Sequence, residues 1–580
     1  MFKRTRLIIT SIFISWCALS TTAFTKPVPV QDIPTAKNGM VASQEAIASR
    51  VGVSILKQGG NAIDAAVAVG FALAVTYPRA GNIGGGGFMV IYHADNKKAT
   101  AIDYREMAPA ASHRDMFLNK DGQVDHKKSR FSALSSGIPG TVAGMIYALE
   151  KYGTLPIETV IQPAIDLATD GFTVPAELER SLTRSQRRIG QYKTTASTYY
   201  PDGKAPETGS IFKQPDLASV LITIRDKGRD GFYKGEVAEK IATDSANNNG
   251  IITMQDLADY RVIERAPVQG TYRGHKIIAM PPPSSGGIHL IQMLNILEHW
   301  DIKKSKLNSA ETINRQVEAM KRAYADRSQH LGDPSFYNVP VDHLISKDYG
   351  EKIYQAIHKT AVTPSELIAP VKLTMKESEQ TTHYSVMDKF GNAVANTYTL
   401  NASYGNGRVA EGTGILMNNE MDDFSSKPGA PNMFGLIGAE ANAIQAGKRP
   451  LSSMTPAIVV KDGRPLLATG SVGGSRIITS VLQAISNVID HDMDIQSATI
   501  APRFHHQWIP DTVVMEQGFE PDTINQLRSM GYKIDLPGEM GNSATPAWKD
   551  IGFIQSVMFK EGVFTGCADP RRPHSLAVGY

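Results

Sequence analysis

The stretch Glu379-Gln380-Thr381-Thr382-His383-Tyr384-Ser385-Val386 marks the sharpest change of character in this sequence. Before it, residues 359–380 lose apolar periodicity and contain two prolines and several charged residues, which predicts a surface segment. After it, residues 383–387 and 393–400 alternate around a polar turn with a glycine, which predicts a β-hairpin. Thr381 stands at this junction, but threonine is common in strands and its position alone does not make it a nucleophile.

Length and composition indicate a large soluble protein with an export signal. The 580 residues, 42% hydrophobic and 20% charged, allow several domains or one large two-part domain. Three basic residues precede an apolar run over 7–19 and small residues up to Ala23. This pattern predicts a signal peptide over residues 1–23 and export to the periplasm or out of the cell. A membrane anchor is disfavoured because the run is well short of about 20 residues.

Charge and cysteine usage exclude several classes of protein. Without the three basic residues of the signal peptide, 57 Lys and Arg remain of 60, against 57 Asp and Glu. A net charge of zero gives no reason to expect a nucleic-acid partner. Cys567 is the one cysteine outside the signal peptide, so neither an intramolecular disulfide nor a cysteine-ligated zinc site is expected.

The first part of the chain predicts helices, then a glycine run, then a hairpin. Residues 42–76 indicate two helices separated at Gly59-Gly60, the second of them buried. The run 81–87 precedes a strand, whereas a phosphate site needs glycines between a strand and a helix, so we expect close backbone packing beside a site. Strands at 88–92 and 100–105 predict a hairpin with Arg105 at a strand end.

The rest of the chain is helical at first and rich in strands later. Residues 140–260 read as mostly helical, and Ser284-Ser285-Gly286-Gly287 is interpreted as the cap of an apolar helix over 288–300. The pattern Gly-x-Ser-x-Gly of a hydrolase elbow is absent there. A further helix has its core face over 313–331, and a strand at 464–470 precedes a helix at 477–489.

Two segments could carry chemistry. Gly473-Gly474 lies between a strand and a helix, an order in which exposed amides can stabilise an oxyanion, although a simple tight turn is the alternative. The cluster at 418–423 could bind calcium, act as a glycosidase pair, hold a substrate ammonium or be solvated. EF-hand spacing is missing, and His383 and His505-His506 lie outside any His-Glu-x-x-His motif, so we expect no metal.

Seven motifs together raise the interest of Thr381. They are Gly-Asn-Ile-Gly-Gly-Gly-Gly-Phe-Met (81–89), Asp-Tyr-Arg-Glu-Met-Ala-Pro (103–109), Met-Pro-Pro-Pro-Ser-Ser-Gly-Gly (280–287), Gln-Thr-Thr-His-Tyr-Ser (380–385), Met-Asp-Asp-Phe (421–424), Arg-Pro-Leu-Ser-Ser-Met (449–454) and Gly-Gly-Ser-Arg (473–476). In this order they closely resemble the bacterial γ-glutamyltransferases (γ-glutamyltranspeptidases) of the N-terminal nucleophile hydrolase superfamily.

The resemblance implies an α+β fold, a four-layer αββα sandwich formed jointly by two self-processed subunits. It implies cleavage between Gln380 and Thr381, giving a large subunit over 24–380 and a small subunit over 381–580 that stay together as a heterodimer. It also implies no cofactor, no metal and no membrane anchor once the signal peptide is removed.

The resemblance assigns roles to individual residues. Thr381 would be both nucleophile and, through its freed α-amino group, general base; it would take the γ-glutamyl group of glutathione or related compounds and pass it to water, an amino acid or a peptide. The other implied roles are a hydrogen bond to the nucleophile (Thr399), the oxyanion amides (Gly473, Gly474), the α-carboxylate site (Arg105, Ser452, Ser453) and the α-ammonium site (Asn401, Glu420, Asp423).

One residue departs from the family pattern. Many bacterial members have a tyrosine in the lid segment where Pro431-Asn432-Met433-Phe434-Gly435 stands here. We therefore hypothesise that Phe434 gives a looser lid and a different balance between hydrolysis and transfer. The alternatives to a γ-glutamyltransferase are a cephalosporin (glutaryl) acylase, which the acidic pair Glu420 and Asp423 disfavours, and an exported binding protein without activity.

Overall fold

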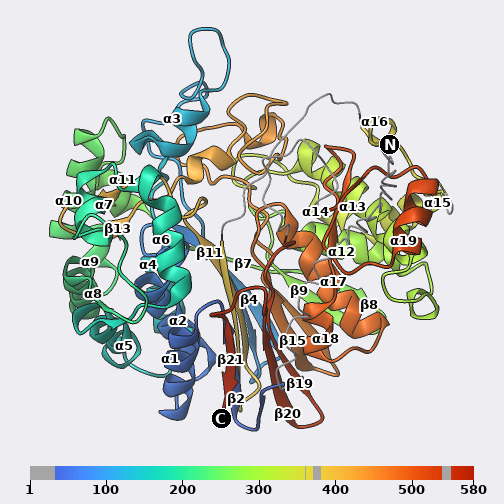
Figure 1. Cartoon of the computed structure of the whole chain (residues 1–580), viewed down its shortest axis with the longest axis horizontal. Helices are drawn as coiled ribbons and strands as arrows, with labels where there is room; N and C mark the ends of the chain where they lie inside the picture. The colour runs from blue at the N-terminus through green and yellow to red at the C-terminus, as the bar shows by residue number, and fades with distance from the viewer. Residues whose placement is uncertain (1–32, 359–360, 370–380, 538–549) are drawn as a thin grey trace, which may run out of the picture. The chain divides into compact units, whose positions relative to one another are not determined.

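Two seven-stranded antiparallel sheets form the centre of the protein. A computed structural model describes residues 33–358, 361–369, 381–537 and 550–580 (Figure 1). The first sheet has the order β21 (Leu576–Gly579), β2 (Gly39–Ser43), β10 (Thr382–Asp388), β11 (Ala393–Thr399), β3 (Gly86–His93), β4 (Lys98–Tyr104) and β7 (Ile263–Arg265). The second has the order β1 (Thr35–Ala36), β20 (Val563–Ala568), β19 (Gln555–Lys560), β15 (Arg464–Gly470), β14 (Ala457–Lys461), β9 (His275–Ala279) and β8 (Val268–Tyr272).

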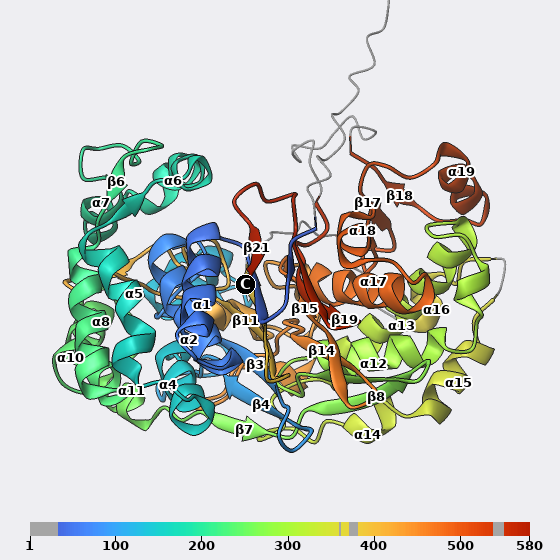
Figure 2. The same ribbon diagram turned by 90° about the horizontal axis from the view of Figure 1, so that it is seen from below.

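The sheets lie face to face with helices on both outer sides (Figure 2). The first sheet is covered by α1 (Ala46–Lys57), α2 (Ala62–Thr76) and α4 (Thr141–Tyr152). The second is covered by α12 (Gly286–Leu297), α17 (Arg476–Asp490) and α18 (Ile495–Ile500), and α13 (Ala310–His330) packs on α12. The expected α+β, four-layer αββα sandwich is therefore confirmed.

Burial on both faces explains the nearly continuous apolar character of the central strands. In β3, Phe88 and Val90 belong to the core that includes the second sheet, whereas Met89 and Ile91 belong to the core under α2. Side chains alternate between the two faces of a strand, so a strand buried on both sides needs apolar residues at every position. The predicted hairpins β3–β4 and β10–β11 are both present.

The start of α2 shows why the predicted helix pair breaks where it does. Gly59 has φ +96°, a conformation open to glycine at little cost, and it ends the first helix. Asn61 then accepts hydrogen bonds from the N–H groups of Ile63 and Asp64, while the Asp64 carboxylate accepts from Asn61. This capping box fixes the start of a helix whose residues are all buried.

The remaining elements extend the outer layers. Residues 157–259 add α5 (Ile157–Thr169), α6 (Ala176–Ile189), α7 (Lys193–Tyr199), α8 (Pro215–Lys227), α9 (Asp230–Tyr233), α10 (Gly235–Asn247) and α11 (Met254–Asp259). The shorter helices are α3 (His126–Phe131), α14 (Val341–Leu344), α15 (Lys347–Gln355), α16 (Ser365–Ile368) and α19 (Pro521–Ser529). Minor strands are β5 (Phe172–Thr173), β6 (Ile211–Phe212), β12 (Val409–Ala410), β13 (Ile415–Leu416), β16 (Phe504–His505), β17 (Val513–Met515) and β18 (Ile534–Asp535). Among the described helices, each is too short or too polar to cross a membrane.

Segments from before and after Thr381 interleave in both sheets. In the first, β2 lies between β21 and β10, and β11 pairs with β3. In the second, β1 pairs with β20 at one end and β9 pairs with β14 near the other. Separating the two parts of the chain would therefore break five backbone hydrogen-bond ladders: β2–β21, β2–β10, β3–β11, β1–β20 and β9–β14.

Candidate active site

The β10–β11 hairpin places Thr381 opposite Thr399. The register pairs Thr382 with Tyr398, so the next position outward on each strand brings these two threonines together. Directly opposed residues of an antiparallel pair have side chains on the same face, with Cβ atoms about 5 Å apart. Thr381 is 7% exposed and Thr399 is 3% exposed, and the Thr399 hydroxyl accepts a hydrogen bond from the N–H of Asn401 at 2.8 Å.

Both threonines line a small cavity of about 20 Å³, room for about one water molecule. Its lining consists of Arg105, Arg327, Thr381, Thr399, Asn401, Glu420, Asp423, Phe434, Leu436, Ser452, Ser453, Met454, Gly474 and Ile477. Nine of the predicted site residues and the predicted lid residue are among them. Gln380, like the predicted signal peptide, lies outside the described residues. The cavity therefore joins residues that are far apart in the sequence.

Glycines at 84 and 85 let the chain pass close behind this hairpin. A Cβ on Gly85 would lie 2.0 Å from the carbonyl oxygen of Thr399, and one on Gly84 would lie 2.1 Å from that of Leu416. No side chain fits at either position. The prediction that the glycine run serves close backbone packing beside a site is confirmed.

Arg105 lies one residue beyond the end of β4, with its guanidinium in the cavity wall. Its Nη1 contacts the Glu420 carboxylate and its Nη2 lies 2.6 Å from Asp423 Oδ2. Its Nε also donates to the carbonyl of Pro450 at 3.2 Å. Burial alone would lower the pKa of Arg105, but the neighbouring carboxylates raise the pKa overall, so the charge is held firmly.

Three carboxyl groups surround this arginine. Burial raises the pKa of Glu420 well above its usual value, and Arg105 only partly counters it; burial likewise raises the pKa of Asp423. The third, Glu106, was not predicted: it is completely buried, its Oε2 lies 3.7 Å from Arg105, and burial raises its pKa to about 7. Burial is the main cause of the raised pKa values, and the repulsion among the neighbouring carboxyl groups adds to it.

The polar cluster at 418–423 divides between the cavity and the scaffold. Glu420 and Asp423, in a short 3-10 helix, face Arg105. Asp422 points elsewhere: it accepts hydrogen bonds from Ser129 at 2.7 Å and from the N–H of Met433 at 2.9 Å. Within the described residues, no group of acidic, histidine or cysteine side chains has the arrangement of a metal site.

Arg327 is a second buried cation that the sequence did not reveal. It lies near the end of α13, where its Nε donates to Ser285 Oγ at 3.0 Å and its Nη2 to Ser453 Oγ at 3.2 Å. Burial lowers its pKa to about 10, an effect that more distant charges offset only in part. Its position within a long helical pattern gave no sequence signal for a role in the cavity.

The stretch 284–287 does begin α12, as predicted, but Ser284 rather than Ser285 accepts a hydrogen bond from the first N–H group of the helix. Ser285 stands at the N-cap position of α12, but its side chain makes no capping hydrogen bond. Its hydroxyl instead donates to the carbonyl of Ser452 at 2.8 Å and accepts from Arg327. The neighbouring Ser284 hydroxyl accepts from the N–H of Gly286 at 3.1 Å. The serine pair thus holds the 452–453 segment against Arg327.

Asn401 and Ser452 complete the polar lining and are themselves fixed by the backbone. Asn401 adopts φ +73° and its Nδ2 donates to the carbonyl of Asn419 at 3.0 Å. The Ser452 hydroxyl accepts from the N–H of Met454 at 3.1 Å. His383, by contrast, lies outside the cavity lining: it is buried between Thr397 and Ser385, and burial lowers its pKa to about 3.

The Gly473-Gly474 turn forms the opposite wall, next to Phe434. Gly473 has φ +122° and Gly474 has φ +57°, and α17 begins two residues later. A Cβ on Gly474 would lie 2.3 Å from the Phe434 ring. Gly474 lines the cavity, whereas Gly473 faces Gly552 on the other side. A Cβ built on Gly473 would lie 3.3 Å from the Cα of Gly552. Of the two predicted oxyanion glycines, only Gly474 therefore belongs to the lining among the described residues.

The site thus combines a buried hydroxyl, charges of both signs and a glycine turn before a helix. A carboxylate ligand would find Arg105 and Arg327, and an ammonium ligand would find Glu420 and Asp423. Because Arg105 already contacts both of these acids, a bound zwitterion must exchange partners with the protein.

Comparison with known proteins identifies the family. The family model described as gamma-glutamyltranspeptidase matches residues 48–579. The glutathione hydrolase proenzyme of Escherichia coli (strain K12) is 52% identical over 547 residues, which are 94% of this chain and 92% of that protein. Two solved structures are also similar. The cephalosporin acylase from Bacillus halodurans has a TM-score of 0.84 and 27% identity, covering 96% of this chain and 98% of that one. A chain of the Helicobacter pylori gamma-glutamyltranspeptidase has a TM-score of 0.56 and 46% identity, covering 59% of this chain and 97% of that one. This chain belongs to the gamma-glutamyltranspeptidase family.

Proposed function

We propose that the protein is an exported γ-glutamyltransferase with glutathione hydrolase activity. It would take the γ-glutamyl group from glutathione or a related compound and pass it to water, an amino acid or a peptide. The observation that carries this proposal is the cavity itself, which Thr381 lines together with Arg105, Glu420 and Asp423. An α-amino acid needs both signs of charge in one pocket.

Self-cleavage between Gln380 and Thr381 would generate the nucleophile. The hydroxyl attacks the preceding carbonyl carbon, the peptide bond becomes an ester, and water hydrolyses that ester. The freed α-amino group, with a reference pKa of about 8, can then accept the hydroxyl proton near neutral pH. In support, the matched Helicobacter pylori chain spans 59% of this chain, close to the share that residues 24–380 represent.

In turnover, the Thr381 oxygen would attack the γ-carbonyl carbon and the proton would pass to the α-amino group. The resulting oxyanion would be held by the amides of Gly473 and Gly474 until the leaving amine takes the proton and departs. An ester on Thr381 remains, which water or an acceptor amine opens by the reverse steps. Thr399, directly opposite, would orient the hydroxyl.

Substrate binding would replace contacts that the protein makes with itself. The α-carboxylate would occupy Arg105, Ser452 and Ser453, with Arg327 as a second cation beside Ser453. The α-ammonium would take over Asn401, Glu420 and Asp423. The positions of Glu420 and Asp423 support this assignment, because both buried carboxyl groups line the cavity, where an ammonium group would stabilise their ionised forms against the burial that raises their pKa values.

The same charge argument weighs against the acylase alternative. The similarity to the Bacillus halodurans acylase, at 27% identity, extends over nearly the whole chain and keeps this alternative open to test. A glutaryl group, however, brings a carboxylate without an ammonium. It would leave the excess negative charge around Arg105 without a partner.

The two subunits are proposed to remain together after cleavage. Their strands alternate within both sheets, so separation would disrupt the core. We further propose export through the predicted signal peptide over residues 1–23 and a mature enzyme without a membrane anchor, acting in the periplasm or outside the cell.

Replacing Thr381 by alanine tests nucleophile and cleavage together. The wild-type protein should give bands of about 39 and 22 kDa on a denaturing gel, from residues 24–380 and 381–580. Thr381→Ala should remain one band near 60 kDa and release no glutamate from glutathione. Thr382→Ala is the matched control, since the Thr382 hydroxyl is buried without a hydrogen-bond partner among the described residues. Activity in Thr381→Ala, or turnover of glutaryl but not γ-glutamyl substrates by the wild type, would overturn the proposal.

A further inference from the structure

Residues 550–554 lie directly behind the Gly473-Gly474 turn. A Cβ on Gly473 would be 3.3 Å from the Cα of Gly552. Gly552 has φ +72°, and a Cβ there would be 2.9 Å from the carbonyl oxygen of Val472 and 2.5 Å from Ser471 Oγ. The two loops therefore lie close together through backbone atoms, with the Ser471 and Ser480 hydroxyls beside Gly552. Any movement of residues 550–554 is passed to the turn.

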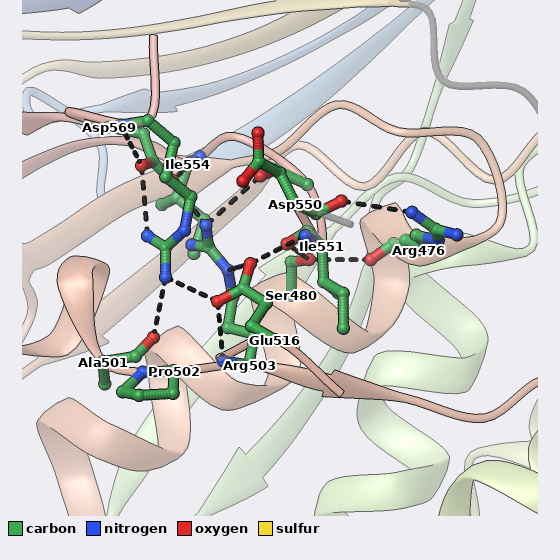
Figure 3. Close-up of polar contacts among 12 residues, drawn as sticks. Arg476, Ser480, Ala501, Pro502, Arg503, Glu516, Asp550, Ile551, Ile554 and Asp569 are labelled. Atoms are coloured by element: carbon green, nitrogen blue, oxygen red, sulfur yellow. Dashed lines mark hydrogen bonds and ion pairs between the residues drawn. The ribbon is translucent and has the colours of Figure 1, made fainter. Parts of the chain in front are cut away.

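A buried network of four charges lies on the far side of this segment (Figure 3). Arg503 Nη2 is 2.7 Å from Asp569 Oδ2, and Arg571 bridges Asp569 at 3.2 Å and Glu516 at 2.6 Å. The side chains of Arg503 and Asp569 are at most 1% exposed, and those of Glu516 and Arg571 are 8% and 12% exposed. Two positive and two negative charges balance. We call these residues the four-charge network.

The network holds the segment through its backbone groups. Glu516 Oε1 accepts from the N–H of Ile551 at 2.7 Å, and Asp569 Oδ2 accepts from the N–H of Ile554 at 3.0 Å. Arg503 Nη2 donates to the carbonyl of Gly552 at 3.2 Å. The network thus holds two backbone N–H groups, of Ile551 and Ile554, and the carbonyl of Gly552 between them. Figure 3 shows Ile551 and Ile554 beside the charged side chains.

The other side of the segment is held by the first turns of α17. Arg476 Nη1 donates to the carbonyl of Asp550 at 3.1 Å, and Ser480 Oγ donates to that of Ile551 at 3.0 Å. Figure 3 shows both side chains reaching the segment from this helix. Because α17 begins just after Gly474, the segment, the helix start and the turn form one rigid unit.

We propose that the four-charge network positions the Gly473-Gly474 amides for the reaction, acting through residues 550–554. This inference rests on the proposed function, in which those amides hold the oxyanion. Burying four charges costs desolvation energy that well-packed apolar residues would avoid. What apolar residues cannot supply is a set of directed hydrogen bonds to the N–H and C=O groups of one loop. Donors that stabilise an oxyanion must be fixed in direction before the reaction.

Glu516→Gln is the decisive variant. The carboxylate accepts from Ile551, from the N–H of Arg503 and from Arg571, whereas an amide offers one oxygen and turns a donor toward the others. We expect a self-cleaved protein whose kcat for a chromogenic γ-glutamyl anilide falls about tenfold to a hundredfold while KM stays within about twofold. The Ki of a γ-boronic acid analogue of glutamate, which becomes tetrahedral on Thr381, should rise in step with the loss of kcat. The Ki of glutamate should not change.

Asp490→Asn is the matched control. Asp490 is a buried carboxylate in an ion pair with Arg273, and it accepts from the hydroxyl of Tyr272 at 2.8 Å. It lies at the opposite end of α17, about 20 Å from the start of that helix. The variant should lower the melting temperature but leave kcat and the boronic acid Ki unchanged. It therefore separates loss of stability from loss of positioning.

Three results would overturn the inference. The first is an unchanged kcat in Glu516→Gln, and the second is a fall in its kcat with no change in the Ki of the boronic acid. The third is a Glu516→Gln variant that has the melting temperature of the wild type but does not cleave itself. If Glu516→Gln does not fold, Arg571→Lys, at the more exposed edge of the network, is measured in the same way against the same predictions. A wild-type protein that does not turn over any γ-glutamyl compound would instead refute the proposed function.

Discussion

The two walls of the cavity are built on opposite principles. The charged wall, lined by Arg105, Glu420 and Asp423 with Glu106 buried beside Arg105, consists of charged side chains from two distant segments. The backbone wall is the turn at Gly474, which lines the cavity next to the Phe434 ring, while Gly473 faces Gly552 behind it. The first can exchange partners with a ligand, whereas the second is closely packed and presents backbone groups. We therefore expect the charged wall to govern substrate binding and the backbone wall to govern the rate of the reaction.

Electrostatics gives the same division. In the charged wall, burial raises the pKa of Glu106 to about 7, and Glu420 and Asp423 both contact Arg105, so an ammonium ligand would add a second positive partner there. The backbone wall presents fixed dipoles at the start of α17. Fixed dipoles stabilise charge that develops during the reaction without paying for reorganisation.

Gly474→Ala should break the backbone wall and have the largest effect. The new Cβ would lie 2.3 Å from the Phe434 ring, and φ +57° is unfavourable for alanine. We expect kcat to fall by about a hundredfold or more, the cost of losing one oxyanion donor, with a much smaller change in KM. Steady-state kinetics with a γ-glutamyl anilide on the self-cleaved protein would measure this.

Gly562→Ala is its control, because that glycine has φ +82° but nothing within 4 Å of an added Cβ. It should cost about 1 kcal/mol of stability and leave kcat unchanged. A Gly474→Ala variant that retains wild-type kcat would contradict the division between the two walls.

Glu106→Gln should change the charged wall in a way that shows in the free energy of unfolding, which should rise relative to wild type between pH 4.5 and 7. Its native pKa of about 7 lies above the usual 4.5, so the folded state binds the proton more tightly than the unfolded state. Proton binding by Glu106 contributes fully to the free energy of unfolding below pH 4.5. This contribution, up to about 3 kcal/mol, is lost as the pH rises to 7. Glutamine does not titrate, so the variant should gain stability relative to wild type across this range.

Urea midpoints between pH 4.5 and 7, compared in a Thr381→Ala background that keeps the chain uncut, would measure the difference. Glu561→Gln, which removes an exposed carboxyl in a turn, is the control. A stability difference between Glu106→Gln and its parent that does not change with pH would exclude an excess of buried negative charge.

Phe434→Tyr should have the smallest effect, because it acts where the lid meets the backbone wall. The ring packs on Gly474, and the added hydroxyl restores a hydrogen-bonding group at the edge of the cavity. One hydrogen bond contributes about 1 kcal/mol, so the ratio of transfer to hydrolysis should change about two- to fivefold. Product analysis with glutathione and an acceptor peptide would detect this, and an unchanged ratio would refute the looser lid.

The sequence predicted the local elements well and the contacts between them unevenly. The hairpins, the helix pair and the glycine packing follow from periodicity and turn chemistry, and all are present. Glu106 and Arg327 were missed because each looks like an ordinary charged residue beside a strand or within a helix. The Ser284-Ser285 stretch begins a helix as predicted, but Ser284 makes the hydrogen bond to the helix, because a distant arginine binds the Ser285 hydroxyl.

The sequence by itself determined the strands, the helices and, through its resemblance to a family, the residues to inspect around Thr381. It could do so because backbone propensity, side-chain alternation and capping act over a few residues. Only the tertiary structure decided that Arg327 lines the cavity, that Glu106 is buried beside Arg105 and that Glu516 contacts the segment behind the glycine turn through Ile551. Those contacts join residues 35 to 126 positions apart or depend on which way a buried side chain points, and the packing of two sheets and their helices sets both.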